Sequence, residues 1–243
     1  MIKAVFFDLD GTLYDFFDAA QAALRSVSQG LQSGGAGGPL GVSGFSDAFW
    51  RGYYRLMECS RGRCLDPRTA LPGLMASALR ESGMRNRSSA PGICLTLAER
   101  WVQGFLSAVR PFEGVKELLS GLCARGVQIG VISNGARDFQ KLKLETLGLI
   151  SYFKDQSLIF SEEIGSGKPD PEIFRAALGS CGLRAEEVLF VGDSPVTDVP
   201  GAVKAGFQVI WLNRYGLPAP VGHREVPQAR CFSEASEMIL AIK

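Results

Sequence analysis

Histidine is almost absent from this chain of 243 residues. The only one, His223, lies in a stretch that also contains proline and glycine near the end of the sequence. A catalytic triad built on histidine and a zinc site with several histidines are therefore not expected. Any acid–base chemistry is expected to come from carboxylates.

Long apolar runs and an excess of one charge are also missing. No segment approaches the roughly 20 apolar residues that a membrane span requires, so no membrane association is expected. The 26 Lys and Arg residues balance 25 Asp and Glu residues, and no long basic block occurs, which argues against binding to a nucleic acid polymer. Lys3 is followed by only four apolar residues before Asp8, too few for a signal peptide.

The cysteines show neither a CxxC pair nor the spacing of a metal finger. A chain of this size needs no disulfide bonds to be stable, so we expect reduced thiols in a cytoplasmic protein. The six cysteines are Cys59, Cys64, Cys94, Cys123, Cys181 and Cys231.

The most informative stretch is AVFFDLDGTL, residues 4–13. Its apolar start predicts a strand buried on both faces of a parallel sheet, and Asp8 and Asp10 follow at the carboxyl end, where such sheets bind their ligands. Two carboxylates this close repel each other unless a cation joins them, which favours a hard divalent metal ion. Gly11 allows a sharp turn. The alternative is an ordinary strand-to-turn junction, because Asp and Gly favour turns in any case.

From Pro111 onward, apolar strand patterns alternate with helical ones, which predicts a doubly wound parallel sheet with a Rossmann-like core. Gly126 is expected to end the first of these helices, Asp170 to cap a later one and Pro171 to begin it. We expect strands over 127–133, 158–160, 188–191 and 208–212, and helices over 114–125, 139–147, 171–181, 198–206 and 236–242.

Residues 15–107 show only helix and loop patterns, which predicts an all-helical domain inserted in an α/β core of residues 1–14 and 108–243. The aromatic residues of 45–57 have the spacing of a buried helix face, although one of them could instead face a base or ring of a substrate. We expect helices over 15–27, 45–57, 71–81 and 95–109, with Leu95 directed inward in the last of them, and a glycine-rich loop over 30–44.

The polar residues at the predicted strand ends share one location, because all strands of a parallel sheet end at the same edge. Together they offer carboxylates, one lysine and small hydrogen-bonding groups, a set suited to a phosphate held by a metal ion and a lysine. The set consists of Asp8, Asp10, Ser133, Asn134, Lys168, Asp193 and Asp198.

The segments DLDGT, Ser-Asn-Gly, GKPDP and GDSPVTD resemble, in this order, the four motifs of the haloacid dehalogenase superfamily. The resemblance covers residues 1–14 and about 108–215, and the insertion resembles the helical cap that follows the first motif in some members. The stretch from VISNG to GDSPVTDVPGA is similar to the branch that contains pyrimidine 5′-nucleotidases and N-acylneuraminate-9-phosphatase. The cap carries no motif to which a specificity can be assigned.

The resemblance implies that Asp8 is a nucleophile that forms an aspartyl-phosphate. It implies that Asp10 protonates the leaving oxygen and then activates water. An ordinary aspartate titrates near ~3.9, so this role requires neighbours that raise the pKa of Asp10.

The resemblance further implies a Mg²⁺ ion held by Asp8, by the main-chain carbonyl of Asp10 and by Asp193, with Asp198 in support. Ser133, the Asn134 amide and Lys168 would hold phosphate oxygens, and Thr12 would brace the loop. The implied function is a Mg²⁺-dependent phosphatase of small phosphomonoesters, with nucleoside monophosphates or sugar phosphates as the leading substrates.

Three other functions remain open. A phosphomutase of the same superfamily would use the entire core set. A 2-haloacid dehalogenase would also use an aspartate nucleophile, but such sequences lack the second aspartate, here Asp10. A phospho-switch without turnover would leave the insertion and Asp198 unexplained. The oligomeric state and the natural substrate do not follow from the sequence.

Overall fold

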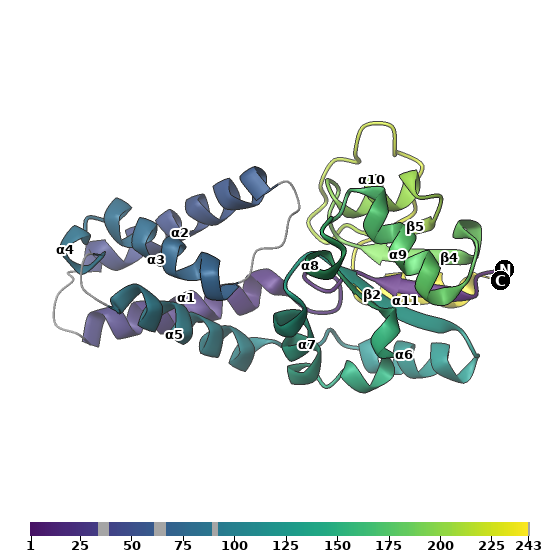
Figure 1. The fold of residues 1–243 in the computed structure, drawn as a ribbon, viewed down its shortest axis with the longest axis horizontal. Coiled ribbons are helices and arrows are strands. Elements are labelled where there is room, and N and C mark those ends of the chain that lie inside the picture. The colour runs from purple at the N-terminus through teal and green to yellow at the C-terminus, as the bar shows by residue number, and fades with distance from the viewer. Residues whose placement is uncertain (34–38, 61–66, 89–91, 243) are drawn as a thin grey trace. The chain divides into compact units, whose positions relative to one another are not determined.

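The computed structural model describes residues 1–33, 39–60, 67–88 and 92–242 (Figure 1). The chain divides into two compact units. Unit 1 contains Met1–Asp15 and the chain from Arg110 onward, and unit 2 contains the described residues between Phe16 and Val109.

Unit 1 is built on a parallel sheet with the strand order β3-β2-β1-β4-β5-β6. β1 is central, and its residue Phe7 lies level with Val131 of β2 and Val191 of β4. This order and the parallel pairing confirm the predicted doubly wound α/β fold. The strands are β1 (Ala4–Phe7), β2 (Gln128–Ser133), β3 (Leu158–Phe160), β4 (Val188–Gly192), β5 (Gln208–Leu212) and the unpredicted β6 (Gln228–Ala229).

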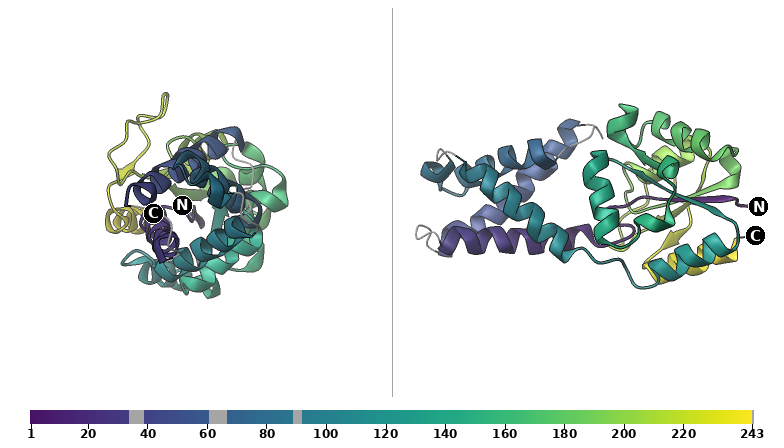
Figure 2. Two further views of the ribbon diagram at one scale, coloured as in Figure 1. Left: turned by 90° about the vertical axis from the view of Figure 1, so that its left-hand side faces the viewer. Right: turned by 60° about the horizontal axis from the view of Figure 1, so that its bottom comes forward.

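Helices cover both faces of the sheet, as Figure 2 shows. α9 (Pro171–Cys181) and α10 (Asp198–Lys204) pack on one face, where Phe174 of α9 contacts Phe190 of β4 edge to face at 5.5 Å between ring centroids. α6 (Val115–Ala124) and α11 (Phe232–Ala241) lie on the other face. Since every residue of β1 and β4 is buried, these layers explain the apolar strand sequences.

Several helix predictions in unit 1 hold, and others are wrong in detail. Gly126 follows α6 with a φ of 72°, as a helix-ending glycine should, and Pro171 begins α9. Asp170 makes no side-chain capping bond to α9, because its carboxylate accepts a hydrogen bond from Ser166 Oγ at 3.1 Å. The last helix starts at Phe232, four residues before the predicted position.

Unit 1 contains further helical segments besides these four. They are α7 (Arg137–Thr146), α8 (Ser161–Ile164) and the 3₁₀ turns Ile150–Tyr152, Asp155–Ser157 and Ala185–Glu187.

Helices joined by short turns make up the described residues of unit 2. Within it, the short helix α4 follows Glu81, and Leu95, predicted to face inward, is 53% exposed. Its helices are α1 (Phe16–Ser33), α2 (Pro39–Ser60), α3 (Pro67–Glu81), α4 (Arg85–Ser88) and α5 (Ile93–Ala108).

The predicted loop over 30–44 is wrong at both ends, because α1 continues to Ser33 and α2 begins at Pro39; residues 34–38 lie outside the described residues. At the end of α1 the glycine serves close packing instead of a turn. A Cβ on Gly30 would lie 2.2 Å from Nη1 of Arg100 in α5, and one on Gly104 of α5 would lie 3.1 Å from the Cα of Ala23. The glycines therefore allow α1 and α5 to approach each other.

Aromatic side chains fill the interior of unit 2. Phe45, Phe49 and Phe105 are almost fully buried, and Trp101 stacks on Phe105 with 4.9 Å between ring centroids. The prediction of a buried aromatic face on 45–57 is confirmed for Phe45 and Phe49, whereas Tyr54 is half exposed. Over the described ranges, no helix of either unit has both the length and the apolar character needed to cross a bilayer.

Candidate active site

The turn after β1 brings its backbone close to a neighbouring strand end. The Asp8 N–H donates to Val191 O of β4 at 2.8 Å, so the register of the sheet fixes where Asp8 lies. Gly11 has a φ of 91°, and a Cβ at this position would lie 2.2 Å from Oδ2 of Asp193. A residue with a side chain would therefore be strained and would collide with Asp193.

Three carboxylates meet beside this turn. Asp193 directly follows β4, and Asp198 begins α10 and accepts a hydrogen bond from the Ser194 N–H at 2.9 Å. One carboxylate oxygen from each of Asp8, Asp193 and Asp198 lies within 4.8 Å of the other two. Gathering three anionic oxygens in a largely buried place is typical of a site for a hard cation.

Lys168 supplies the positive charge of this cluster. Its side chain is 3% exposed, and its ammonium donates to Asp8 and lies 2.7 Å from Oδ1 of Asp198. Burial by itself would lower the pKa of Lys168, but the carboxylates of Asp198 and Asp8 outweigh it and raise that pKa above its usual value. Lys168 therefore stays protonated at neutral pH.

The crowding shows in the pKa values of the acids. Burial is the main reason that the pKa of Asp8 rises to about 7, with further contributions from Asp198 and Asp10 that Lys168 opposes. Burial, followed by the charges of Asp8 and Asp198, also raises the pKa of Asp193 well above its usual value. One lysine thus does not neutralise the cluster, and these hard oxygen donors fit a divalent cation such as Mg²⁺.

Asp10 faces a different environment from the one expected. Its carboxylate oxygens lie 2.7 and 2.8 Å from the Lys143 ammonium and accept hydrogen bonds from the Tyr14 hydroxyl and from Gln140 Nε2. Burial alone would raise the pKa of Asp10, but Lys143 and these hydrogen bonds hold it below its usual value. The prediction that neighbours raise the pKa of Asp10 is therefore wrong for this arrangement, because a buried lysine pairs with it.

The two polar residues at the end of β2 are both engaged. Ser133 is 1% exposed and accepts a hydrogen bond from Gln140 Nε2 at 2.7 Å. The side-chain amide of Asn134 binds the main chain of Lys168 twice, donating to its carbonyl at 3.0 Å and accepting from its N–H at 2.8 Å. Asn134 thereby fixes the loop that carries Lys168, and a phosphate contact from Asn134 would have to come from its main-chain N–H.

Thr12 is fully buried, and within the described part of the chain its hydroxyl has no hydrogen-bond partner. Its N–H lies 3.4 Å from the carbonyl of Leu9. The bracing role stays a prediction.

The sequence did not single out Tyr14, Gln140 or Lys143. Gln140 and Lys143 are three residues apart in α7 and hence on one helix face. Both are nearly fully buried. The sequence signal that could have found this pair is its spacing. Both polar positions fall on the inward face of a helix that begins four residues after Ser133.

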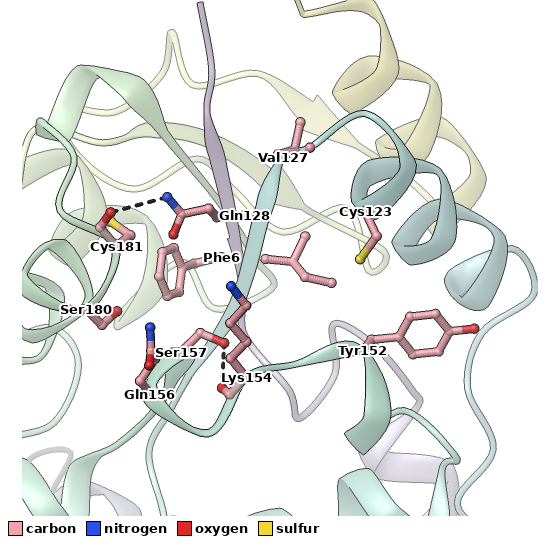
Figure 3. Close-up of a pocket in the computed structure, with 12 residues that line it drawn as sticks. Phe6, Cys123, Val127, Gln128, Tyr152, Lys154, Gln156, Ser157, Ser180 and Cys181 are labelled. Atoms are coloured by element: carbon pink, nitrogen blue, oxygen red, sulfur yellow. Dashed lines mark hydrogen bonds between the residues drawn. The ribbon is translucent and has the colours of Figure 1, made fainter.

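A pocket lies away from these groups, at the opposite edge of the sheet (Figure 3). It is formed by residues around the start of β2 and the approach to β3, among them Gln128 and Ser157, and by the end of α9. Gln128 Nε2 donates to the Cys181 carbonyl across it at 3.3 Å. The acidic cluster, by contrast, follows the carboxyl ends of β1 and β4.

The model of the haloacid dehalogenase-like hydrolases matches residues 2–206. The chain belongs to this family. The four motifs predicted this membership. The three carboxylates of the acidic cluster lie on two of the segments that carry the resemblance, Asp8 on DLDGT and Asp193 and Asp198 on GDSPVTD.

Relatives with different names share this family. The chain is 31% identical to a phosphoserine phosphatase of Thermus thermophilus, over 88% of this chain and 89% of that protein. It is 36% identical to the pyrimidine 5′-nucleotidase YjjG of Escherichia coli, over 54% of this chain and 55% of that one. The structure of a 2-haloacid dehalogenase from Pseudomonas syringae superposes with a TM-score of 0.68 at 28% identity, over 99% of both chains.

Proposed function

We propose that the protein is a Mg²⁺-dependent phosphatase that hydrolyses small phosphomonoesters through an aspartyl-phosphate on Asp8. The observation that carries the proposal is the position of Asp8 at the end of the central strand, in contact with Lys168 and grouped with Asp193 and Asp198. The positive charge of Lys168 can neutralise part of the charge on Asp8 and on the phosphate. The buried Asp8 carboxylate can therefore approach an anionic phosphate.

The residues that would hold Mg²⁺ are Asp8, Asp193 and the main-chain carbonyl of Asp10. When bound, the ion would neutralise charge on the phosphate oxygens and on the carboxylates. Asp198 would support the site without binding the ion itself, since it pairs with Lys168 and accepts a hydrogen bond from the Ser194 N–H. Because Gly11 has no side chain, the Asp193 carboxylate can approach the loop that carries the Asp10 carbonyl.

The chemical steps fall to the two aspartates. Asp8 attacks phosphorus, the bond to the leaving oxygen breaks, and that oxygen takes a proton from Asp10. Asp10 then accepts a proton from the water that cleaves the aspartyl-phosphate. A low pKa makes Asp10 deprotonated before the first step and a weak base in the second. The negative charge of an arriving phosphate would raise that pKa toward the range in which one group can serve both steps.

Phosphate oxygens would be held by the Ser133 hydroxyl, the Asn134 main-chain N–H and the Lys168 ammonium. Relatives named phosphoserine phosphatase and pyrimidine 5′-nucleotidase both act, by name, on phosphomonoesters. Nucleoside monophosphates, which fit the second of these names, and sugar phosphates, which the sequence resemblance implies, are the leading substrates.

We propose that unit 2 is the cap of this enzyme and that residues 14–15 and 109–111 are its hinges. Within unit 1 the two connections lie side by side, because the Phe112 N–H donates to Leu13 O at 3.0 Å. Arg214 pairs with Asp15 and lies 4.4 Å from the centroid of the Phe112 ring, so it holds both connections. Unchanged hydrogen exchange in unit 2 on adding Mg²⁺ and a phosphate analogue would argue against a closing cap.

A cytoplasmic location is part of the proposal. Cys94, Cys123, Cys181 and Cys231 are free thiols, as expected for a reducing compartment. The side chains of Cys59 and Cys64 lie outside the described residues.

The test is release of inorganic phosphate from a panel of nucleotides, sugar phosphates and phosphoglycolate, with Mg²⁺ or EDTA. Wild type should release phosphate only with the metal, and Asp8→Asn should lose turnover entirely, because phosphomonoester hydrolysis needs accelerations of up to ~10²¹. The exposed Asp138 provides a control, and Asp138→Asn should retain wild-type turnover. A wild-type rate in Asp8→Asn would refute the mechanism.

A dehalogenase is the second candidate, because the chain superposes on a 2-haloacid dehalogenase. Chloride release from 2-chloropropionate without phosphate release would establish it. Conversion of a sugar phosphate into its isomer without free phosphate would instead identify a phosphomutase.

A further inference from the structure

The buried face of α7 contacts two of the proposed catalytic groups at once. Gln140 and Lys143 are 1% and 3% exposed, and both contact Asp10. Lys141, between them in sequence, is on the outer side of the same helix and pairs with Asp155 at 3.0 Å. One helix therefore carries an inner and an outer lysine, each in an ion pair.

Gln140 ties Asp10 to the end of β2. Its Nε2 lies 2.7 Å from Ser133 Oγ, 3.1 Å from Asn134 O and 3.2 Å from Asp10 Oδ2. The opposite amide orientation would turn an oxygen toward a carboxylate and a carbonyl, so these acceptors fix the direction of the amide. In the described residues its Oε1 has no partner, which shows that the amide is held through its donor side.

Gln140 Nε2 has two N–H groups for these three acceptors, and Ser133 Oγ is the nearest of them. A hydroxyl has one proton to donate and lone pairs that accept. Because Ser133 Oγ accepts from Gln140, its own proton remains available for another acceptor, such as a phosphate oxygen. A Cβ on Gly135 would lie 2.7 Å from Gln140 Nε2, so the backbone also packs closely against the amide.

Lys143 holds Asp10 from the other side. Its buried ammonium contacts both carboxylate oxygens, at 2.7 and 2.8 Å, while Tyr14 donates to one of them. The Asp10 side chain nevertheless remains 26% exposed, so part of the carboxyl group is accessible. A carboxylate with three protein donors cannot turn freely, and its open side has a defined direction.

We infer that Gln140 and Lys143 are positioning residues: Lys143 directs the Asp10 carboxyl group toward the leaving oxygen, and Gln140 directs the Ser133 proton toward phosphate. The inference rests on the proposed phosphatase function. Neither residue would touch the reacting atoms, so each acts through its partner. The two roles differ in what they predict for the leaving group.

The experiment compares Lys143→Met, Gln140→Met and the matched control Lys141→Met, using p-nitrophenyl phosphate and an alkyl phosphate. An alkoxide leaving group depends on protonation, whereas p-nitrophenolate leaves with little help. Lys143→Met should lower kcat for the alkyl ester by about 10²-fold or more, the scale of general acid catalysis, with KM nearly unchanged and a smaller loss for p-nitrophenyl phosphate. Lys141→Met should match wild type with both esters.

Gln140→Met should lower kcat/KM by about 10-fold on both esters, as expected for one hydrogen bond. In a double-mutant cycle, Ser133→Ala should then add little to Gln140→Met, because both changes remove the same directed proton. Lys143→Arg, which keeps the charge, should recover part of kcat and also covers the case in which Lys143→Met does not fold. Equal losses of kcat on both esters in Lys143→Met and Lys143→Arg, or additive effects in the double-mutant cycle, would overturn the inference.

Crystal structures of Lys143→Met and Gln140→Met give an answer that does not depend on turnover. The Asp10 carboxyl group should leave its wild-type position in the first variant, and the Ser133 hydroxyl should have a different partner in the second. Unmoved side chains would contradict the inference even in an active phosphatase. Absence of phosphate release by wild type would refute the proposed function alone.

Discussion

The ammonium of Lys168 lies 2.7 Å from Oδ1 of Asp198, and both side chains are at most 3% exposed. The same ammonium contacts Asp8 on the central strand. One cation therefore joins the loop before α9, the start of α10 and the end of β1. Such a buried contact acts on stability as well as on chemistry, because removing one partner leaves the other charge buried and unpaired.

We expect Lys168→Met to lower the free energy of unfolding by about 3–5 kcal/mol at neutral pH without divalent metal. Urea denaturation would measure it. Lys3→Met is the control, since Lys3 pairs with Glu187 at a similar 2.7 Å but is 55% exposed. An exposed pair contributes at most about 1 kcal/mol, so equal losses in the two variants would show that burial of Lys168 has no energetic role.

Metal affinity should rise with pH. Asp8, whose pKa is raised to about 7, and Asp193, whose pKa is also raised, must lose their protons before they can bind a cation. From Asp8 alone, Mg²⁺ affinity should increase about 10-fold between pH 6 and pH 8. Calorimetric titration at the two pH values would measure it. Asp8→Asn should show weaker binding with a smaller pH dependence, and an equal affinity of wild type at both pH values would contradict the assignment.

Gly11 is a position where conformation and contact can be separated. Gly11→Ala should destabilise the protein through its φ of 91°, at about 1–2 kcal/mol, and should also push Asp193 aside, because the new Cβ would lie 2.2 Å from Oδ2. Gly114→Ala has a similar φ of 84° with no atom within 4 Å of the new Cβ. Only Gly11→Ala should therefore weaken Mg²⁺ binding, and equal Mg²⁺ affinities in the two variants would refute a role for the close contact.

The sequence predicted the sheet well because its signal is local. β3 and β5 have the predicted bounds, since short apolar runs flanked by polar residues describe buried strands in any context. The candidate site followed from the same topology, because parallel strands end at one edge.

Features that depend on packing were missed. Gly30 belongs to a stretch with the composition of a loop, but it lies inside α1, where Arg100 approaches. Only the packing of α1 against α5 explains a glycine at this position. Likewise, Lys143 is one of two lysines in α7, and its helical register predicts an inward position but not the contact with Asp10, whereas Lys141 pairs with Asp155. The prediction of a raised pKa for Asp10 is wrong for this reason.

The acidic cluster should make the metal-free protein less stable at high pH than at low pH. Burial, followed by the charges of Asp8 and Asp198, raises the pKa of Asp193 above its ordinary value of 3.8. A carboxyl group whose pKa is higher in the folded protein contributes stability below its unfolded pKa and loses that contribution as the pH rises through the folded value. Asp193→Asn removes this loss.

Urea denaturation in EDTA would measure this effect. The free energy of unfolding of Asp193→Asn should rise relative to that of wild type as the pH increases from 5 to 8. Asp155→Asn is a control without pH dependence over this range. Hydrogen bonding by Lys141 is the first cause that lowers the pKa of Asp155, so its contribution to stability changes only as the pH falls below its unfolded value of 3.8. Saturating Mg²⁺ should reverse the order at pH 8, since the ion stabilises only a folded protein that binds it and Asp193→Asn has lost a ligand. If wild type were more stable than Asp193→Asn at pH 8 both with and without Mg²⁺, the three carboxylates would not repel one another. The argument for a cation between them would then fail.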